Sequence, residues 1–392
     1  MERIGIFGGS FDPPHIGHIH AARQAMQTLG LDRLLLIPAH IAPHKKGAAA
    51  DGTHRLQMLR QAVQDQPNME VSNLELLRQG PSFTYETVEQ VRSMYPDAEI
   101  FLLMGSDMFL SFCNWKYPEK ILEIATLAVF YRGHWDEKAK VEAKKAEYDA
   151  AGYRVVLVEN SCVEISSTQV RRLLAFHCAD EFLPAGVGAY IRRNGLYDTN
   201  ENWKNLPMAD LEQVVIGLLN PNRVAHVLGC RDTAVALARR WGVNETDAAR
   251  AGLLHDVTKA LDGPLQLTLC RCYGRVLDDF SRRYPKTLHA FTGSLVAQRI
   301  FGETQAVVSA IECHTTGKAA MNMLEKIIYV ADYMEPNRNF PGVENLRELA
   351  YTDIRAALKL GLEMTLEHLK RQESEVSPES REALAWLGTH IE

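Results

Sequence analysis

The sequence lacks the features of exported and membrane-spanning proteins. No apolar run approaches the ~20 residues that a helix needs to cross a bilayer. After Met1 the chain enters an apolar segment almost at once, without a basic region, a longer apolar region and a small-residue cleavage site. We therefore expect no secretory leader, and we expect a cytoplasmic protein that does not bind membranes.

Cysteine is scarce and irregularly spaced. The chain has 7 cysteines, an odd number, and their spacing forms no disulfide framework. Cys270 and Cys272 form a CxC pair, but no second pair accompanies it, so we do not expect a zinc site there. The pattern indicates a reducing compartment.

A strong excess of charge is absent as well. The formal net charge is −6 over 392 residues, and 23% charged and 46% hydrophobic residues are ordinary for a globular protein. This balance does not favour binding of nucleic acid or of anionic membranes, although local basic residues still permit small anionic substrates. We see no internal repeat and no low-complexity tract. The length favours two domains.

The sequence pattern changes near residue 200. Before that point short β-rich runs alternate with amphipathic stretches, which is typical of a doubly wound α/β domain. The expected buried, parallel strands are Ile4–Phe7, Leu34–Ile37, Ile100–Met104, Leu127–Tyr131 and Val155–Val158. The ligand of such a sheet lies outside the carboxyl ends of its strands, where Gly8 and Gly105 are found.

The second part of the chain is predicted to be all-α, because helical periodicity continues from about Met208 onward. The expected helices are Asp210–Leu219, Ala225–Trp241, Glu245–Leu254, Thr292–Phe301, Thr304–His314, Met323–Tyr333 and Thr352–Glu373. A short polar stretch, residues 198–202, has no periodicity and predicts a linker. We thus expect an α/β domain over residues 1–198, a linker over 199–209 and an all-α domain over 210–392.

A candidate phosphate site lies near the start of the chain. Residues 4–18 read IGIFGGSFDPPHIGH, a strand that runs into a glycine-rich turn and then a helix near Ile16. Glycine lets the backbone approach a phosphate, and a helix N-terminus offers N–H groups and positive potential. His15 and His18 share a helix face, and Gly17 between them leaves space for a triphosphate. The alternative is a structural turn with solvent-exposed histidines.

A second set of chemically competent residues lies in the helical part. His255 and Asp256 adjoin at the end of an apolar helix, where burial is costly unless a charged group compensates. The further ligand-type residues are His226, His289, His314 and Asp332. Four histidines and two aspartates suit a divalent metal such as Fe, Mn, Co, Ni or Zn. Six ligands exceed the needs of one hydrolytic ion, so we predict two ions that share a carboxylate.

The segment GGSFDPPHIGH resembles the (H/T)xGH signature of the nucleotidyltransferase superfamily. Residues 164–172, EISSTQVRR, resemble the ISSTxxR signature of the same superfamily. Ser and Thr oxygens together with free N–H groups at a helix start also bind anions by themselves. The resemblance implies that His15, His18 and Arg171 act on the ATP phosphates. The phosphate cradle that it implies consists of Gly8, Gly9, Ser10, Phe11, Asp12, Ser166, Ser167 and Thr168.

Three further segments resemble bacterial nicotinate-mononucleotide adenylyltransferases. They are residues 38–46 (PAHIAPHKK), residues 80–87 (GPSFTYET) and residues 104–107 (MGSD) with the following Trp115. Residues 80–87 have Phe for Tyr and Glu for Asp of the family pattern. The resemblance covers about residues 3–198. It implies transfer of AMP from ATP to nicotinate mononucleotide, which gives nicotinate adenine dinucleotide and pyrophosphate.

The family pattern also implies roles for individual residues. Catalysis rests on positioning and charge neutralisation, to which Lys45 contributes, with Mg²⁺ on the leaving pyrophosphate. The implied substrate-binding residues are Ser82, Thr84, Gly105, Asp107, Trp115 and Arg132. Thr84 and its neighbours meet the pyridine carboxylate, Trp115 stacks on the ring and Asp107 holds a ribose.

The ligand order H…HD…H…H…D resembles the HD phosphohydrolase superfamily. More closely, residues 314–318 (HTTGK), 324–333 (LEKIIYVADY) and 335–338 (EPNR) resemble the HD family of symmetrical dinucleoside-tetraphosphatases, over about residues 210–370. This implies hydrolysis of diadenosine tetraphosphate to two ADP by a dinuclear iron-type centre. The implied metal ligands are His226, His255, Asp256, His289, His314 and Asp332, with Asp256 bridging and acting in catalysis. Lys259 and Arg338 are implied phosphate contacts.

Alternatives stay open for the helical half. It is either this hydrolase, a nucleotide-binding regulatory module, or a hydrolase of another nucleotide. The sequence also leaves open the identity of the metal (Fe, or another transition metal such as Mn or Co), the range of dinucleoside polyphosphates, homo-oligomer formation and coupling between the sites.

Overall fold

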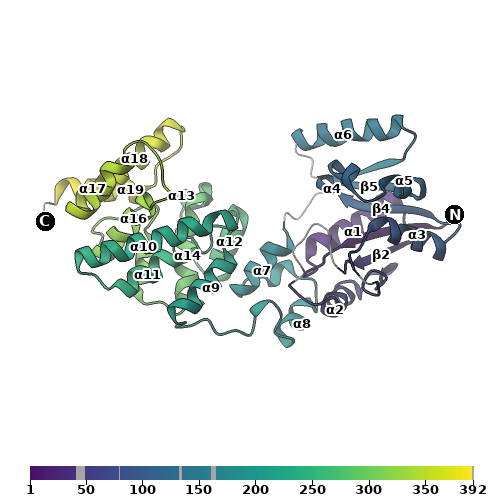
Figure 1. The fold of residues 1–392 in the computed structure, drawn as a ribbon, viewed down its shortest axis with the longest axis horizontal. Coiled ribbons are helices and arrows are strands. Elements are labelled where there is room, and N and C mark those ends of the chain that lie inside the picture. Colours follow the sequence, from purple (N-terminus) through teal and green to yellow (C-terminus); the bar gives the residue numbers. More distant parts are fainter. Residues whose placement is uncertain (41–48, 79, 132–134, 160–164, 391–392) are drawn as a thin grey trace. The chain divides into compact units, whose positions relative to one another are not determined.

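The computed structural model describes residues 1–40, 49–78, 80–131, 135–159 and 165–390. The chain divides into two compact units, Met1–Glu201 and Asn202–Glu392 (Figure 1). Among the described residues, no helix combines the length and the apolar character that a membrane crossing requires.

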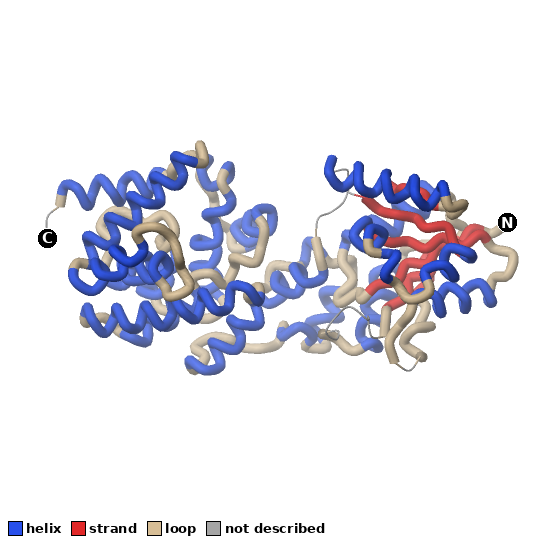
Figure 2. Tube along the Cα trace, turned by 45° about the horizontal axis from the view of Figure 1, so that its top comes forward, coloured by secondary structure: helices blue, strands red, loops and turns tan. Residues whose placement is uncertain are grey.

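The first unit is built on one parallel sheet (Figure 2). Its six described strands lie in the order β3-β2-β1-β4-β5-β6, and every neighbouring pair is parallel. The strands are β1 (Arg3–Gly9), β2 (Arg33–Pro38), β3 (Met69–Val71), β4 (Glu99–Gly105), β5 (Ala125–Tyr131) and β6 (Val155–Glu159). The order reverses between β1 and β4, so the carboxyl ends of these two strands form the switch point where a ligand binds in such sheets.

Helices connect the strands of this sheet. The helices are α1 (Ile16–Leu29), α2 (Gly52–Val63), α3 (Thr84–Met94), α4 (Ser106–Leu110), α5 (Pro118–Ile124), α6 (Trp135–Ala150), α7 (Ser167–Ala175) and α8 (Val187–Arg193), with short 3₁₀ turns η1 (Phe112–Asn114), η2 (Asp180–Phe182) and η3 (Leu196–Asp198). All seven residues of β5 are buried, as expected for a strand covered on both faces. The doubly wound α/β class and the five expected strands are confirmed. Strand β3 is an addition, because three residues at the sheet edge carry too short an alternation to be recognised.

The second unit is helical throughout its described residues. Its helices are α9 (Met208–Leu218), α10 (Val224–Trp241), α11 (Glu245–Leu254), α12 (Gly263–Cys272), α13 (Asp279–Arg283), α14 (Leu288–Arg299), α15 (Gln305–Glu312), α16 (Met323–Met334), α17 (Val343–Thr352), α18 (Ile354–Arg371) and α19 (Pro378–Thr389), with 3₁₀ turns η4 (Pro221–Arg223) and η5 (Pro285–Thr287). Helix α16 is nearly all buried and packs against α10, α15 and α18, so it forms the centre of the core. The all-α prediction for this half is confirmed.

Helix boundaries differ from the expected ones at two informative places. Helix α14 starts at Leu288 rather than at Thr292, which puts His289 in its first turn. The helix expected to start at Thr352 instead starts after Asp353, whose carboxylate accepts hydrogen bonds from the first free N–H groups of α18. This cap separates α18 from α17, which the periodicity did not reveal.

The first residues of the second unit pack on its helices. The ring of Trp203 stacks on Phe301 with centroids 5.8 Å apart, and the Asn205 N–H donates to the carbonyl of Phe301 at 2.9 Å. Arg250 donates from Nη1 to the carbonyl of Leu206 at 2.8 Å. Part of the segment expected as a linker, residues 199–209, is thus bonded to the second unit. The exact linker bounds stay a prediction.

Candidate active sites

The glycine-rich turn after β1 is held by close aromatic packing. Phe11 is 1% exposed and has a positive φ of 47°. Its ring meets Phe7 edge-on at 5.6 Å and His18 at 5.0 Å. A Cβ at Gly9 would lie 3.2 Å from the Phe11 ring, tighter than ordinary contact. Gly9 therefore lets this turn fold back on itself, while a Cβ at Gly8 would meet nothing within 4 Å.

His15 and His18 lie together at the start of α1. Their rings stack with centroids 3.6 Å apart, and His18 Nδ1 accepts a hydrogen bond from the His15 N–H at 3.2 Å. Burial lowers the pKa of His15 to about 4, so its imidazole is neutral at pH 7. Within the described residues His15 Nδ1 is buried without a hydrogen-bond partner. Stacked rings at a helix N-terminus suit an anionic ligand that accepts hydrogen bonds.

The start of α7 packs on the same turn. Ser166 caps α7 and forms a reciprocal capping box with Gln169. The Ser167 hydroxyl donates to the carbonyl of Pro13 at 2.9 Å, across 154 positions of the sequence. The two segments that resemble the superfamily signatures are therefore in direct contact, with two helix N-termini beside one turn.

Asp12 and Arg171 connect the turn to α7. Arg171 donates from Nη1 to the Asp12 carbonyl at 2.6 Å and from Nη2 to Thr168 Oγ1 at 3.2 Å. The Asp12 carboxylate accepts from the Tyr197 hydroxyl at 2.8 Å and from two backbone N–H groups, those of residues 49 and 50. The buried Arg55 donates to the Ser10 carbonyl at 2.8 Å. Asp12 thus organises the turn, a role that its position in the motif does not reveal.

The segment expected to meet the pyridine carboxylate lies next to the end of β2. The Ser82 hydroxyl is buried and accepts a hydrogen bond from the His40 N–H at 3.0 Å. Thr84 is the first residue of α3. Gly105 and Asp107 lie at the start of α4, where a Cβ at Gly105 would be 2.7 Å from Asp107 Oδ1. Lys45 and Arg132 lie outside the described residues.

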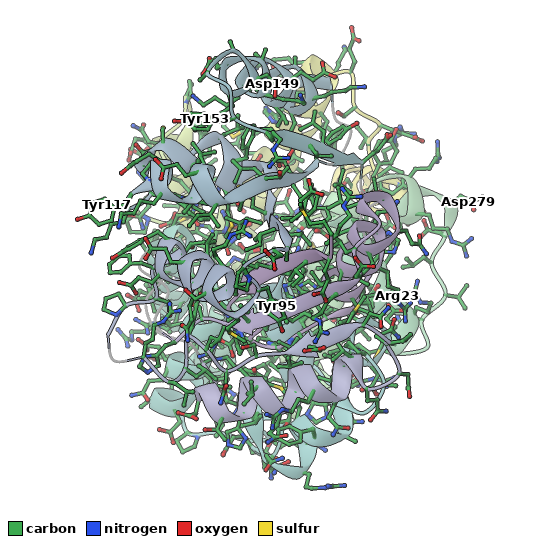
Figure 3. The ribbon with its side chains drawn as sticks, turned by 90° about the vertical axis from the view of Figure 1, so that its right-hand side faces the viewer. Arg23, Tyr95, Tyr117, Asp149, Tyr153 and Asp279 are labelled. Atoms are coloured by element: carbon green, nitrogen blue, oxygen red, sulfur yellow. The ribbon has the colours of Figure 1, made fainter. Side chains whose placement is uncertain are left out.

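Trp115 and Lys116 lie beside aromatic residues of this segment. The half-buried Trp115 ring meets Phe112 at 5.2 Å. Lys116 Nζ lies 4.0 Å from the centre of the Phe83 ring, and Phe83 is the residue between Ser82 and Thr84. The same ammonium group lies near the ring of Tyr117, which projects at the surface (Figure 3). Lys116 was not among the predicted site residues, although it follows Trp115 directly.

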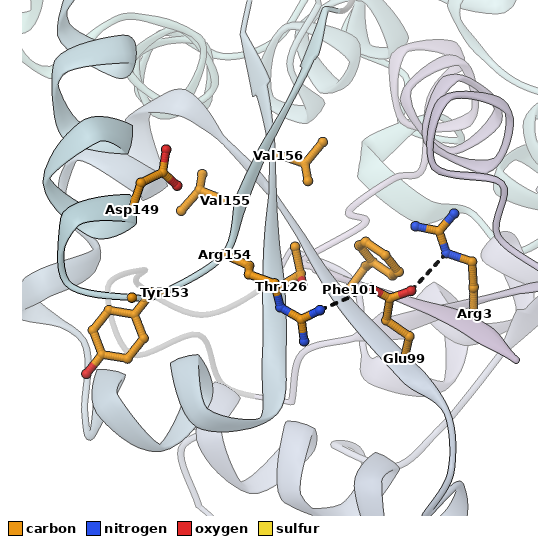
Figure 4. A pocket seen from close by; sticks show the side chains of 10 residues that line it. Arg3, Glu99, Phe101, Thr126, Asp149, Tyr153, Arg154, Val155 and Val156 are labelled. Carbon is orange, nitrogen blue, oxygen red and sulfur yellow. Dashed lines mark hydrogen bonds and ion pairs between the residues drawn. The ribbon is translucent and has the colours of Figure 1, made fainter. Parts of the chain in front are cut away.

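A hollow of about 360 Å³ lies at the opposite, amino-terminal edge of the sheet (Figure 4). Arg3 and Glu99 line it, and the two are joined at 3.1 Å, while Arg154 lies 3.5 Å from the same carboxylate. The charged groups that Figure 4 shows at its centre are thus already paired, and none of the predicted site residues lines it.

In the second unit the six predicted ligand residues converge from separate elements. They are His226 on α10, His255 and Asp256 at the end of α11, His289 on α14, His314 after α15 and Asp332 on α16. We call these six residues the ligand cluster. Helix α11 packs against α10, α15 and α16, which explains how residues far apart in sequence meet.

The atoms of the ligand cluster fall into two groups that Asp256 joins. His226 Nε2 lies 3.1 Å from Asp332 Oδ1 and 3.3 Å from His255 Nε2. Asp256 Oδ2 faces this group, 3.5 Å from His255 Nε2. Its other oxygen, Oδ1, lies 3.4 Å from His289 Nε2 and 3.9 Å from His314 Nε2. One carboxylate therefore faces two sets of nitrogen donors.

Three of the four histidine rings of the cluster, those of His226, His255 and His314, are held with Nε2 toward the cluster. His255 and His314 each have Nδ1 2.7 Å from the carbonyl oxygen three residues earlier, and His226 has Nδ1 3.0 Å from a Glu335 oxygen. Anchoring the outer nitrogen in this way is typical of histidine ligands. Glu335 was not predicted as a site residue, although it lies three positions after Asp332.

The electrostatics of the cluster fit a cation. Burial alone would raise the pKa of Asp256, but His255 and His289 hold it well below its usual range, so the carboxylate is charged. Burial lowers the pKa of His314 to about 4, which leaves its ring neutral. Within the described residues, Asp256 Oδ1 and His314 Nε2 are buried without hydrogen-bond partners. A divalent metal ion would satisfy both atoms.

Three basic side chains surround the cluster. Arg223 donates from Nε to Asp256 Oδ2 at 2.6 Å, and Arg338 donates from Nη2 to Asp332 Oδ1 at 2.7 Å. Lys259 Nζ lies 2.9 Å from the Nε2 of His289. Lys259 and Arg338 were predicted, whereas Arg223 was missed. Arg223 lies three residues before His226, and this spacing could have indicated that the two side chains point in the same direction.

Known proteins resemble each of the two units of the chain. The cytidylyltransferase-like family model matches residues 6–173, and the HD domain model matches residues 223–337. A probable nicotinate-nucleotide adenylyltransferase of Carboxydothermus hydrogenoformans is 38% identical over 199 residues, which cover 50% of this chain and 98% of that protein. A probable nicotinate-nucleotide adenylyltransferase/Ap4A hydrolase of Mycoplasma pneumoniae is 28% identical over 375 residues, 93% of this chain and 98% of that protein.

One solved structure is a predicted HD superfamily hydrolase involved in NAD metabolism from Clostridium acetobutylicum, 34% identical, covering 47% of this chain and 98% of that one, with a TM-score of 0.46. The match to the Carboxydothermus protein covers 98% of that protein at 38% identity. The chain therefore belongs to the nicotinate-nucleotide adenylyltransferase family, and it carries an HD domain in addition.

Proposed function

We propose that the first unit transfers AMP from ATP to nicotinate mononucleotide. The observation that supports this is the contact between the turn after β1 and the start of α7, since it brings the segment of His15 and His18 next to the segment of Arg171. A phosphate oxygen of nicotinate mononucleotide bonds to the α-phosphorus of ATP, and the bond to the pyrophosphate oxygen breaks. Because the nucleophile is already an anion, positioning and charge neutralisation suffice.

Each proposed group has a separate task in this transfer. The N–H groups at the starts of α1 and α7 and the two histidines bind phosphate oxygens. Lys45 neutralises charge on the leaving pyrophosphate, and a bound Mg²⁺ would supply further positive charge there. Lys116, next to Trp115 and over the Phe83 ring, supplies positive charge for the carboxylate of the pyridine ring. A coupled assay of dinucleotide formation with ATP and nicotinate mononucleotide tests the proposal, and no product from folded protein would contradict it.

We also propose that the second unit hydrolyses dinucleoside polyphosphates, with diadenosine tetraphosphate cleaved symmetrically to two ADP. The carrying observation is the ligand cluster with its unpartnered Asp256 and His314 atoms. The cluster would hold two transition-metal ions, iron or another ion such as Mn or Co, with Asp256 between them. When bound, such ions lower the pKa of water and stabilise charge on phosphate oxygens.

The protein side chains have defined tasks in this hydrolysis. Water adds to one of the two central phosphorus atoms, and the bridging oxygen leaves with the second ADP. Arg223, Lys259 and Arg338 bind the phosphate oxygens and neutralise the charge that develops on them. The test is to incubate the full chain with Fe²⁺ or Mn²⁺ and diadenosine tetraphosphate and to separate the products. ADP alone is expected, whereas ATP with AMP would contradict symmetrical cleavage, and binding without products would indicate a regulatory module.

A further inference from the structure

Glu335 lies next to the ligand cluster without being one of its six residues. It is 1% exposed and follows the last turn of α16. Its Oε1 lies 3.0 Å from Nδ1 of His226, while Nε2 of the same ring lies 3.1 Å from Asp332 Oδ1. The carboxylate therefore meets the ring nitrogen that points away from the cluster.

The other oxygen of Glu335 is held in place by Asn337. Oε2 accepts one hydrogen bond from the Asn337 backbone N–H and one from its side-chain Nδ2, both at 2.8 Å. The same Nδ2 donates to the carbonyl of Ala225 on α10 at 3.2 Å. The carboxylate is thus fixed against the first turn of α10, where His226 lies.

Gly229 provides the space for this arrangement. It lies on α10 three residues after His226, so the two share a helix face. A Cβ at position 229 would overlap Glu335 Oε2, and it would be 3.2 Å from Asn337 Nδ2. Any residue other than glycine would therefore displace the carboxylate from His226.

We propose that Glu335 is a positioning residue of the metal centre, and that the missing side chain at Gly229 leaves the space that the Glu335 carboxylate occupies. A neutral imidazole carries one N–H, and a carboxylate at Nδ1 keeps that proton there. Nε2 then has its lone pair directed at the cluster, and the ring is a better donor to a metal ion. The inference rests on the proposed metal-dependent function of the second unit.

The test measures Co²⁺ binding to the full-length protein by equilibrium dialysis and elemental analysis. Glu335→Ala and Gly229→Ala should weaken Co²⁺ binding about 10–100-fold, the usual effect of losing such a partner. Glu325→Ala is the matched control. Glu325 is also 1% exposed and lies on α16, but its carboxylate is bonded to Lys318 and Ser309 instead of a cluster histidine. Its Co²⁺ affinity should stay that of the wild type.

The outcomes separate the inference from the proposed function. If folded Glu335→Ala binds Co²⁺ with wild-type affinity, the inference is overturned and the proposed function is not. The same holds if Glu325→Ala loses as much Co²⁺ affinity as Glu335→Ala does. Wild-type protein that binds no Co²⁺ overturns the metal-dependent function and the inference with it. Circular dichroism reports the helical content, and thermal unfolding of the second unit reports its folding in each variant. Glu335→Gln, which retains an acceptor oxygen, should recover part of the lost affinity.

Discussion

At the residue scale, the chemistry depends on how each ring nitrogen and carboxylate oxygen is directed. His15 and His18 stack and share one hydrogen bond at the start of α1. Asp256 directs one oxygen at His255 and the other at His289. The positions of these residues were predictable from local spacing. Their orientations depend on partners elsewhere in the chain.

His18→Ala should lower dinucleotide synthesis by roughly 10²–10³-fold, because a group that stabilises charge in the transition state is lost. Hydrolysis of diadenosine tetraphosphate should be unchanged, since the ligand cluster is in the other unit. His20→Ala is the control, because a residue two positions on does not share the helix face. A parallel fall in both activities of folded His18→Ala would contradict two separate sites.

Asp256→Asn should remove most of the hydrolase activity and lower the content of bound metal, because one carboxylate faces both groups of histidine nitrogens. Dinucleotide synthesis should survive. Elemental analysis and the two rate assays check this. Full hydrolysis by Asp256→Asn, together with wild-type protein free of transition metal, would exclude the metal centre.

Lys116→Met should reduce the preference for nicotinate mononucleotide over the nicotinamide form about tenfold, or roughly 1.4 kcal/mol. The reason is loss of positive charge beside the segment of Ser82 and Thr84. The measurement is kcat/KM for both substrates. Lys120→Met is the control, since its ammonium is bonded to Glu89 at 3.2 Å. Equal kcat/KM for both substrates in the wild type would contradict the carboxylate site itself.

At the scale of elements, long periodic segments were predictable and short or capped ones were not. Helix α10 has 18 residues and buries one continuous face, so its periodicity marks it in the sequence. Helix α13 has five residues, and α17 is separated from α18 only by the cap of Asp353. A period of 3.6 residues is not resolved over the five residues of α13. The close approach of α10 and α11 was not predictable either.

Gly252→Ala should destabilise the second unit by about 1–3 kcal/mol, since a Cβ there would lie 2.8 Å from the Arg231 Cα. A backbone atom inside a packed helix pair cannot move aside as a flexible side chain can. Calorimetry of the second unit's unfolding transition measures this. Gly217→Ala on α9 is the matched control, because its Cβ would meet nothing within 4 Å. The control should be neutral or stabilised by up to about 1 kcal/mol. Equal stability of the two variants would refute the steric argument.

At the scale of the whole molecule, two units with separate cores each carry one candidate site. The change of pattern near residue 200 revealed this division, because α/β alternation and unbroken helical periodicity differ over long windows. The position of the boundary was less predictable. Residues 202–206 (NWKNL) show no periodicity, and their contacts with Phe301 and Arg250 assign them to the second unit.

A fragment of residues 202–392 should therefore melt several degrees above a fragment of residues 207–392, which keeps α9 complete. The shorter fragment loses the stacking of Trp203 on Phe301 and two hydrogen bonds. A loss of about 1 kcal/mol in the free energy of unfolding lowers the melting temperature by roughly 2–4 °C for a domain of this size. Thermal unfolding of both fragments measures the difference. Trp203→Ala in the full chain should shift the same transition downward. Identical midpoints would assign residues 202–206 to a true linker.

The sequence by itself determined the type of most elements, the two-part organisation and the residue types at both sites. These follow from short-range spacing, such as two histidines three positions apart or buried runs of strand length, and spacing survives without tertiary structure. Tertiary structure alone decided which distant groups meet. Ser167 bonds Pro13 across 154 positions, and Glu335 bonds His226 across 109. Such contacts depend on how helices pack, and no local period encodes that packing.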